Sequence, residues 1–486
     1  MNALTFSSGY VPARIRTNYA PARIQLVDVR RKLLLTAQLR ILLIGAGFLL
    51  VTAAAMLRIA YLGVVQPAPQ QTSMAEALLP PRGEITDRNG VALARAFPAY
   101  ALWYNPEALG DGGTPLVKSP QDVAARLKAI FPDLDQAATA RFLAAGKQGY
   151  IRRRVLPEDV NRINAIGELA LETPGEQDRQ YPQGKLGAHI LGYVGADGHG
   201  RVGMESFLDK QLLDPAERGQ PVALSIDLRV QGALEDELAA GMRAVDAVGA
   251  AGIVLDVDTG EVMAMASLPA FDPNRIDEEG VKNMFNRVTN QVYELGSTFK
   301  PLTVAAAIDA GTVTDLSRRY PATPFPIGGF TIKDSHPLGA SLNVPEMLMH
   351  SSNVVTAHIV RDLGPGKFKR TIADLGMNER PYIELPARGF PIWSSGEWPL
   401  LRAMTVGYGH GIAVTPLHLA SAYAAMVNGG IWRPATLMKV GPGEVPRGRR
   451  VFKASTSARM NQLLRMIVSY GTGRPSSASP GARCRR

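Results

Sequence analysis

The chain has 486 residues, more than one compact core usually uses, so we expect about three domains of roughly 150 residues each. Hydrophobic residues make up 46% of the chain and charged residues 20%, a globular composition that excludes a wholly disordered protein. The single cysteine, Cys484, excludes an internal disulfide scaffold and a zinc site built from cysteines.

The formal net charge of +10 is concentrated at the two ends of the chain. Residues 1–40 contain seven basic side chains and one acidic side chain, and residues 474–486 add four arginines without an acid. Between these ends, basic and acidic side chains are equal in number. A nucleic-acid-binding protein usually has a basic face on its folded part, so we expect no nucleic-acid partner.

An apolar run covers residues 41–57, which are 17 residues without a charge, and apolar residues resume after Arg58. This length is near the lower limit for a helix that crosses a bilayer. Because basic residues precede the run, we predict a cytoplasmic tail over residues 1–40 and a transmembrane helix over residues 41–63, with the rest of the chain outside the cytoplasm. The alternatives are a buried core helix and a signal peptide cleaved near the alanines at 53–55.

Two folded regions follow this helix. Residues 66–81 are rich in Pro, Gln and Ala, as expected of a linker. Mixed strand-like and helical pieces then predict an α+β domain over residues 64–218, in which the apolar spacing predicts a helix over 123–131. A second folded domain is predicted over residues 219–473.

In the second domain, residues 221–227 are predicted to form a strand, and apolar residues at mainly four-residue spacing predict a helix over 230–245. The alternating segment around Asp258 and Gly260 predicts a hairpin with a tight turn. Helices and short strands alternate from there to about residue 473.

The first candidate catalytic residues lie in the segment over residues 293–311. Gly296 interrupts the chain, Ser297 stands at a helix start, and Pro301 is tolerated in the first turn. Ser297 and Lys300 therefore share a helix face, where the amine can remove the hydroxyl proton if desolvation lowers its pKa. The helix start also suits the oxyanion of an acyl transfer. The plain alternative is a capping serine beside a solvated lysine.

A second candidate feature is Ser351-Ser352-Asn353, placed just before an apolar helix. These residues could bring a hydroxyl and an amide to the nucleophile, but a helix cap predicts the same residue types. Ser341 and Asn343 form another Ser-x-Asn pair, so the triplet has no specificity on its own. A specific prediction of function therefore depends on the order of the motifs along the chain and on the sequence around them.

Taken in order, these motifs resemble those of class B penicillin-binding proteins, the membrane-anchored peptidoglycan D,D-transpeptidases, most closely the septal, cell-division type. The resemblance covers about residues 40 to 473 and includes no long glycosyltransferase domain, so the bifunctional class A enzymes fit poorly. The matching segments are residues 79–94, 179–212, 219–238, 264–275, 293–301, 350–353 and 407–430.

The resemblance implies a multidomain α+β fold: one N-terminal transmembrane helix, an elongated pedestal (dimerisation-type) domain over 64–218, and a transpeptidase domain over 219–473. In the family this last domain is a five-stranded antiparallel sheet with helices on both sides. Ser297 would be the nucleophile acylated by a stem peptide ending in D-Ala-D-Ala, and Lys300 its base. Ser351 and Asn353 would form the second motif, aiding proton transfer and holding the substrate amide.

The same resemblance implies further partners and a location. Peptidoglycan stem peptides, β-lactam antibiotics, the membrane and other division or cell-wall proteins are the expected partners, and we expect no cofactor and no metal. The chain would be a single-pass protein of the cell inner membrane, with a cytoplasmic N-terminus and a periplasmic bulk. Arg82 and Glu205 match pedestal positions where a structural ion pair or a cap is expected. His410 is expected in a loop near the cleft, with a role as a base as the alternative.

One family motif is missing. Lys-Thr-Gly should follow the helix that ends in MNQLLRMIVSYGTG, but it is absent, and residues 439–441 come too early and lack the threonine. Residues 474–486 resemble a truncated or out-of-frame end, with a genuine basic tail as the alternative. We therefore expect an incomplete transpeptidase domain that lacks its last three strands and its C-terminal helix and that is a poor transpeptidase.

Two other functions compete with a transpeptidase. A catalytically impaired or inactive scaffold, a partner in the division complex, would use the pedestal and the membrane helix for binding. A soluble β-lactamase or carboxypeptidase would use the same Ser-x-x-Lys logic, but the pedestal motifs and the membrane segment argue against it.

Overall fold

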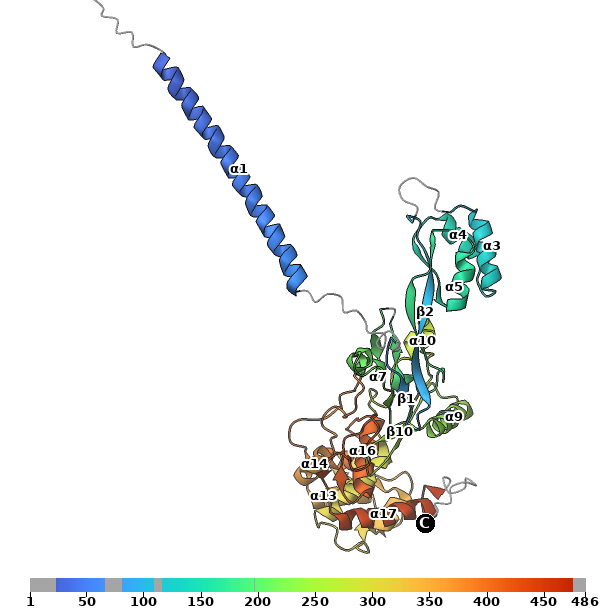
Figure 1. The fold of residues 1–486 in the computed structure, drawn as a ribbon. Helices are drawn as coiled ribbons and strands as arrows, with labels where there is room; N and C mark the ends of the chain where they lie inside the picture. Colours follow the sequence, from blue (N-terminus) through green and yellow to red (C-terminus); the bar gives the residue numbers. More distant parts are fainter. Residues whose placement is uncertain (1–22, 66–80, 109–115, 196, 475–486) are drawn as a thin grey trace, which may run out of the picture. The chain divides into compact units, whose positions relative to one another are not determined.

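The computed structural model describes residues 23–65, 81–108, 116–195 and 197–474. The chain divides into two compact units, residues 1–78 and residues 79–486 (Figure 1). Cys484 and all but the first residue of the predicted basic tail lie outside the described residues.

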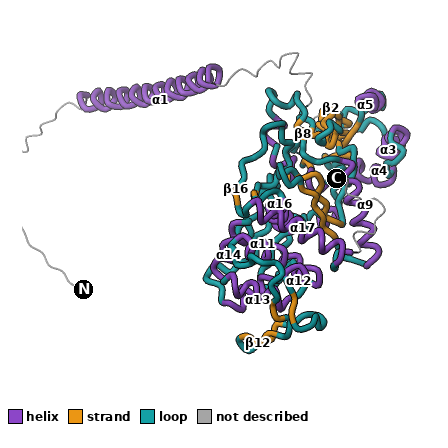
Figure 2. Tube along the Cα trace, turned by 90° about the horizontal axis from the view of Figure 1, so that it is seen from below, coloured by secondary structure: helices purple, strands orange, loops and turns teal. Residues whose placement is uncertain are grey.

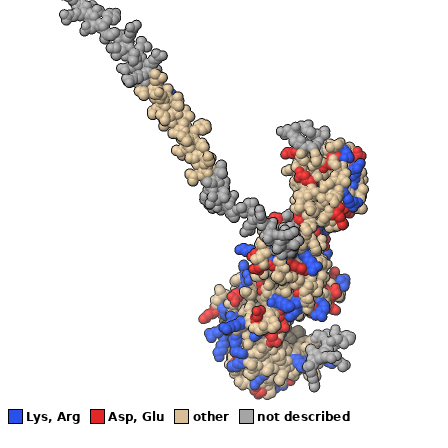
Figure 3. Space-filling model, viewed as in Figure 1, with Lys and Arg blue, Asp and Glu red and all other residues tan. Residues whose placement is uncertain are grey.

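The first unit contains one long helix, α1 (Arg23–Val65). Its segment Leu34–Arg58 has a mean hydropathy of 2.1, and its side chains are exposed. Figure 3 shows this segment almost without charged side chains, whereas blue and red side chains are interspersed over the second unit. By length and composition, α1 is able to cross a membrane.

A six-stranded sheet organises the beginning of the second unit. The long strand β2 (Ala92–Tyr104) pairs with β3 (Gly149–Val155), β4 (Leu171–Glu172) and β5 (Gly175–Gln180). Near the start of β2, β1 (Ile85–Thr86) pairs with it and connects it to β8 (Val222–Ala223).

Three helices enclose a small apolar core at one end of β2: α3 (Pro120–Ile130), α4 (Gln136–Ala144) and α5 (Pro157–Asn164). Leu102 and Tyr104 of β2 are buried there against Val123 and Leu127 of α3. The helix predicted over 123–131 is confirmed as α3, and Ser119 caps its start by accepting a hydrogen bond from the Asp122 amide.

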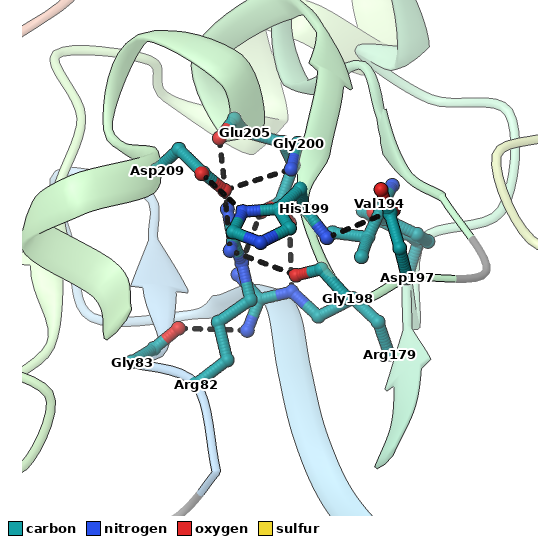
Figure 4. A network of polar contacts seen from close by, with 11 residues as sticks. Arg82, Gly83, Arg179, Val194, Asp197, Gly198, His199, Gly200, Glu205 and Asp209 are labelled. Atoms are coloured by element: carbon teal, nitrogen blue, oxygen red, sulfur yellow. Dashed lines mark hydrogen bonds and ion pairs between the residues drawn. The ribbon is translucent and has the colours of Figure 1, made fainter. Parts of the chain in front are cut away.

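A buried ion cluster joins this sheet to short elements that follow β5, namely α6 (Ala188–Leu191), β6 (Tyr193–Val194), β7 (Gly200–Val202), α7 (Gly203–Phe207) and α8 (Asp209–Leu213). Glu205, which is fully buried, accepts from Arg82 Nε at 2.8 Å and from Arg179 Nε at 2.7 Å (Figure 4). The expected pairing of Arg82 with Glu205 is thus confirmed, and Arg179 is an additional partner.

Asp209 closes the same cluster. It accepts from Arg82 Nη1, from the Gly200 amide and from His199 (Figure 4). Burial opposes its ionisation, but these hydrogen bonds outweigh that effect and lower the pKa of Asp209 from 3.8 to about 2. Asp209 therefore stays charged, and the cluster holds the chain at Arg82 against α7 and α8.

The helix and the hairpin predicted in the second domain are both present. Helix α9 (Leu228–Val245) packs on β9 (Ala250–Leu255) and β10 (Val262–Leu268), which pair in antiparallel register around the predicted turn. The strand predicted over 221–227 is regular only in β8, and Leu224 forms a single bridge with Met438. Among the described residues, β9 and β10 are the two strands of this sheet.

Most of the remaining elements of the second predicted domain are helices (Figure 2). Most of these helices pack around α11, whose side chains are buried from Lys300 to Ile308, so its apolar sequence suits a central position. The helices are α10 (Glu278–Asn283), α11 (Lys300–Asp309), α12 (Val344–His350), α13 (Asn353–Leu363), α14 (Pro365–Asp374), α15 (Leu400–Gly407), α16 (Pro416–Val427) and α17 (Ala454–Tyr470).

Three short hairpin-like pairs complete this region. They are β11 (Tyr320–Pro321) with β14 (Ser341–Leu342), β12 (Phe325–Ile327) with β13 (Phe330–Ile332), and β15 (Ile431–Trp432) with β16 (Arg449–Arg450).

Candidate active site

Ser297 lies in a turn of 3₁₀ helix, Gly296–Phe299, that leads directly into α11. The predicted helix start is therefore correct in position, but its first turn is tighter than an α-helix. Gly296 has φ = +57°, a conformation that glycine adopts without a steric cost. The Ser297 side chain is exposed, so its hydroxyl is open to a substrate.

Lys300 is brought to Ser297 as predicted from the spacing. Its Nζ lies 3.1 Å from Ser297 Oγ and 2.8 Å from Ser351 Oγ, and it also contacts the Ser351 carbonyl oxygen. The residue is only 2% exposed. Burial lowers the pKa of Lys300 from 10.5 to about 8, although the negative charge of Asp334 acts in the opposite direction. A neutral amine, able to act as a base, is thus accessible near neutral pH.

The two serines of the second motif have different roles. Ser351 ends α12 with φ = +59° and directs its hydroxyl to Lys300. Ser352 caps α13 by accepting a hydrogen bond from the Val355 amide. The capping interpretation is therefore correct for Ser352, whereas Ser351 belongs with Ser297 and Lys300.

Asn353 is the first residue of α13 and lies next to Ser351 in the chain. Its Nδ2 donates to the Lys333 carbonyl oxygen at 3.2 Å. This contact orients the amide along the segment that follows β13. The structure thus brings Ser297, Lys300 and Ser351 into direct contact and places Asn353 beside them.

Asp334 is a site residue that the sequence interpretation missed. Its carboxylate accepts from Ser352 Oγ at 2.7 Å, from the Val354 amide at 3.2 Å and from the Asn353 amide. These hydrogen bonds satisfy backbone amides at the start of α13 that have no acceptor within the helix. The Asp334 carboxylate thereby fixes the position of Ser351 and Asn353. A lone aspartate in a loop, 17 residues before Ser351, gives no pattern from which this role is predictable.

The loop after α15 supports the turn that contains Ser297. The Gly296 amide donates to the Gly409 carbonyl oxygen at 3.1 Å. A Cβ atom at Gly409, which has φ = +85°, would lie 2.0 Å from the Gly296 carbonyl oxygen, so only glycine permits this approach. Tyr423 of α16 also donates to the Thr298 carbonyl oxygen at 2.6 Å.

His410 lies in this loop near the cleft, as expected. Its Nδ1 is 3.2 Å from Glu294 Oε2, and the other oxygen of Glu294 accepts from the Gly411 amide at 2.8 Å. Hydrogen bonds from Gly411 and then His410 lower the pKa of Glu294 below its usual 4.5. These contacts connect the loop to the chain just before Ser297.

A groove of about 570 Å³ borders Asn353. Phe330, Ile332, Leu401 and Tyr408 form most of its apolar wall. The groove gives an extended substrate a surface to lie on beside the second motif.

Together these residues define a serine–lysine acyl-transfer site: a solvent-open hydroxyl, a buried amine of lowered pKa and a second hydroxyl on the same amine. Two family models match the chain: the penicillin binding protein transpeptidase domain over residues 250–485 and the penicillin-binding protein dimerisation domain over residues 77–259.

Curated relatives agree with these matches. A probable peptidoglycan D,D-transpeptidase FtsI of Caulobacter vibrioides is 34% identical over 407 residues, which are 84% of this chain and 68% of that protein. The peptidoglycan D,D-transpeptidase FtsI of Escherichia coli K12 is 30% identical over 475 residues, which are 91% of this chain and 80% of that protein. The chain belongs to the class B penicillin-binding proteins.

A solved structure shows the same fold. The peptidoglycan synthetase of Bifidobacterium adolescentis superposes with a TM-score of 0.60 at 21% sequence identity, and 81% of each chain is covered. The expected α+β architecture, a dimerisation domain followed by a transpeptidase domain, is thereby confirmed.

Proposed function

We propose that this protein is an acyl-serine D,D-transpeptidase of septal peptidoglycan synthesis and that β-lactams acylate the same serine. Ser297 Oγ attacks the carbonyl carbon between the two terminal D-alanines of a stem peptide. An ester bond to Ser297 forms, the peptide bond breaks, and the terminal D-alanine leaves as the free amino acid. The amine of a second stem peptide then attacks the ester and releases Ser297.

The contact of Lys300 with both Ser297 and Ser351 carries this proposal. Neutral Lys300 accepts the proton of the Ser297 hydroxyl as the ester forms. Ser351, hydrogen-bonded to the same amine, passes its proton to the nitrogen of the leaving D-alanine and takes the proton that Lys300 accepted, so that Lys300 is neutral again. When the second stem peptide attacks, its amine loses a proton to Lys300, and this proton restores the Ser297 hydroxyl. Asn353 donates its amide N–H to the substrate backbone at the edge of the groove, and by this order of events no proton is lost to solvent.

A second candidate function is a catalytically impaired scaffold, a partner of other division proteins. It is favoured by one observation: the sequence contains no Lys-Thr-Gly triplet to hold the substrate carboxylate. Removal of one such donor typically lowers kcat by about a hundredfold or more. On this alternative, a cell that depends on the protein would tolerate Ser297→Ala.

The proposal includes a topology. Residues 1–40 form a cytoplasmic tail and residues 41–63 cross the inner membrane once, which places residues 64–218, the pedestal, and residues 219–473, the transpeptidase domain, in the periplasm. Residues 474–486 are an atypical basic tail. The cluster of basic residues before the apolar run supports this orientation.

Intact-mass spectrometry of the full chain, with and without benzylpenicillin, tests the proposal. We expect one penicillin adduct on the protein, no adduct on Ser297→Ala, and an unchanged adduct on the control Ser317→Ala, whose side chain is exposed outside the site. An adduct that persists on Ser297→Ala contradicts the assigned nucleophile. Absence of any adduct on the unmodified chain favours the scaffold.

A further inference from the structure

A second cavity, of about 170 Å³, lies in the catalytic region away from Ser297. It is enclosed by the segment that follows α14, by α16 and by β15. Leu375, Gly376, Glu379, Arg380, Arg388 and Trp432 are among its lining residues. None of the residues of the acyl-transfer site lines it.

Trp432 is held rigidly in the wall of this cavity. Gly376, with φ = +79°, lets the indole approach so closely that a Cβ atom there would be 3.2 Å from Trp432 Cζ2. The guanidinium of Arg449 lies 5.0 Å from the indole ring centroid and is itself fixed by donating to the Asp374 carbonyl oxygen. The indole orientation is therefore set by packing, yet its Nε1 is buried and has no acceptor among the described residues.

Two arginines line the same cavity, the half-buried Arg388 and the exposed Arg380. Arg388 Nε is buried without a hydrogen-bond partner, and neither Arg380 nor Arg388 forms an ion pair with the described part of the chain. Buried donors are nearly always satisfied in folded proteins, by the protein or by water, an ion or a ligand. Arg388 Nε and Trp432 Nε1 are two buried donors without an acceptor in the described segments that line one small cavity, and the exposed Arg380 lines it too, so an acceptor from outside the chain would satisfy them.

The cavity is also preformed. His418 at the start of α16 donates from Nε2 to the Glu379 carbonyl oxygen at 2.8 Å, while its Nδ1 accepts from the Thr415 amide at 3.1 Å. Burial lowers the pKa of His418 to about 4, so the imidazole is neutral at neutral pH and keeps both of these hydrogen bonds. The segment around Glu379 is thereby anchored to α16.

We propose that this cavity binds a small oxyanion, a phosphate or a carboxylate group, through Arg380, Arg388 and the indole N–H of Trp432. Guanidinium groups bind both anions through paired, charge-assisted hydrogen bonds, and an indole N–H supplies one further donor. The volume suits a single anionic group or the end of a larger molecule rather than a whole drug-sized ligand. Glu379 lines the same cavity, and its carboxylate opposes the anion.

The test uses the full chain in detergent micelles with ¹⁵N-labelled tryptophan, so that each indole N–H gives one resonance in an NMR spectrum. Trp432→Phe identifies the Trp432 resonance among those of the four tryptophans. Inorganic phosphate and, separately, acetate are titrated against chloride at equal ionic strength. We expect one of the two oxyanions to shift the Trp432 resonance with saturation, and the comparison tells phosphate from carboxylate.

Substitutions of two residues that line the cavity should change its affinity for the oxyanion in opposite directions. Arg388→Gln should weaken binding by about tenfold, the loss of one charge-assisted contact, whereas Glu379→Gln should strengthen it. Arg388→Lys keeps the charge and guards against a folding defect, and Arg465→Gln, an exposed arginine on α17, is the matched control. An unmoved Trp432 resonance, or equal affinities for Arg388→Gln and Arg465→Gln, overturns the proposal and leaves water as the occupant.

Discussion

The reactivity of the site is set at the level of one residue, Lys300. Its burial favours the neutral amine, and its pKa of about 8 lies well below the ordinary value of 10.5. In the proposed mechanism only the neutral amine removes the proton of Ser297, so acylation by benzylpenicillin should rise with pH and level off above an apparent pKa of about 8. Stopped-time mass spectrometry of the adduct across pH 6 to pH 10 measures this profile.

A substitution of Asp334 tests whether this pH profile reports the titration of Lys300. Its negative charge raises the pKa of Lys300, so Asp334→Asn should move the rising limb to lower pH. Asparagine still accepts from the Asn353 and Val354 amides, which limits the structural change. A limb that stays in place or moves to higher pH contradicts the assignment of Lys300 as the base.

The spacing of Ser297 and Lys300 was sufficient to predict their contact, because residues three apart on a helical turn share a face whether the turn is α or 3₁₀. The choice between Ser351 and Ser352 was different. Both precede the same helix, and only the left-handed conformation at Ser351 turns its hydroxyl toward Lys300. Asp334 was not predictable, since its partners are 18 to 20 residues away in the chain.

At the scale of elements, Glu205 joins parts that are distant in sequence. It is fully buried and binds Arg82, 123 residues before it, and Arg179 of β5. Glu205→Gln removes the negative charge that pairs with the buried guanidiniums of Arg82 and Arg179. The free energy of unfolding should therefore fall by about 3 kcal/mol. Urea denaturation of the chain in detergent, followed by circular dichroism, measures this loss.

A surface pair gives the matched control for Glu205. Asp159 of α5 pairs at 2.9 Å with Arg162, whose side chain is 56% exposed. Asp159→Asn should change the free energy of unfolding by less than about 1 kcal/mol. Comparable losses in the two variants would mean that burial does not set the strength of the Glu205 cluster.

The predicted helices and the hairpin were correct because their patterns are local. Helix α9 shows apolar residues at four-residue spacing, and the β9–β10 turn contains Asp258 and Gly260, which favour a tight reversal. The strand predicted over 221–227 is mostly irregular. Its backbone amides donate to different segments: the Leu224 amide to the Thr86 carbonyl oxygen and the Ser225 amide to the Leu437 carbonyl oxygen. No local pattern contains that information.

For the second unit as a whole, β9 has one open edge among the described residues. Its six residues carry no charge and no proline, and Val254 is 37% exposed. Natural proteins protect such edges with charged side chains or proline, so we expect the full chain in detergent to self-associate. Val254→Lys should reduce the associated fraction measured by sedimentation velocity.

Val281→Lys is the control for this effect, because Val281 is 59% exposed on α10 rather than on the sheet edge. Equal behaviour of the two lysine variants would assign self-association to general surface hydrophobicity. A monodisperse unmodified chain would contradict the expectation altogether.

The sequence by itself determined the apolar helix, the α+β composition, the Ser297–Lys300 pair and the family resemblance, because each depends on spacing over a few residues or on the order of motifs. Only the tertiary structure decided that the left-handed backbone at Ser351 turns its hydroxyl to Lys300, that Asp334 holds the start of α13, and that Arg380, Arg388 and Trp432 line one cavity. The physical reason is that burial and hydrogen bonding act between segments that the chain separates by tens of residues, and these contacts set the charge state and direction of each side chain.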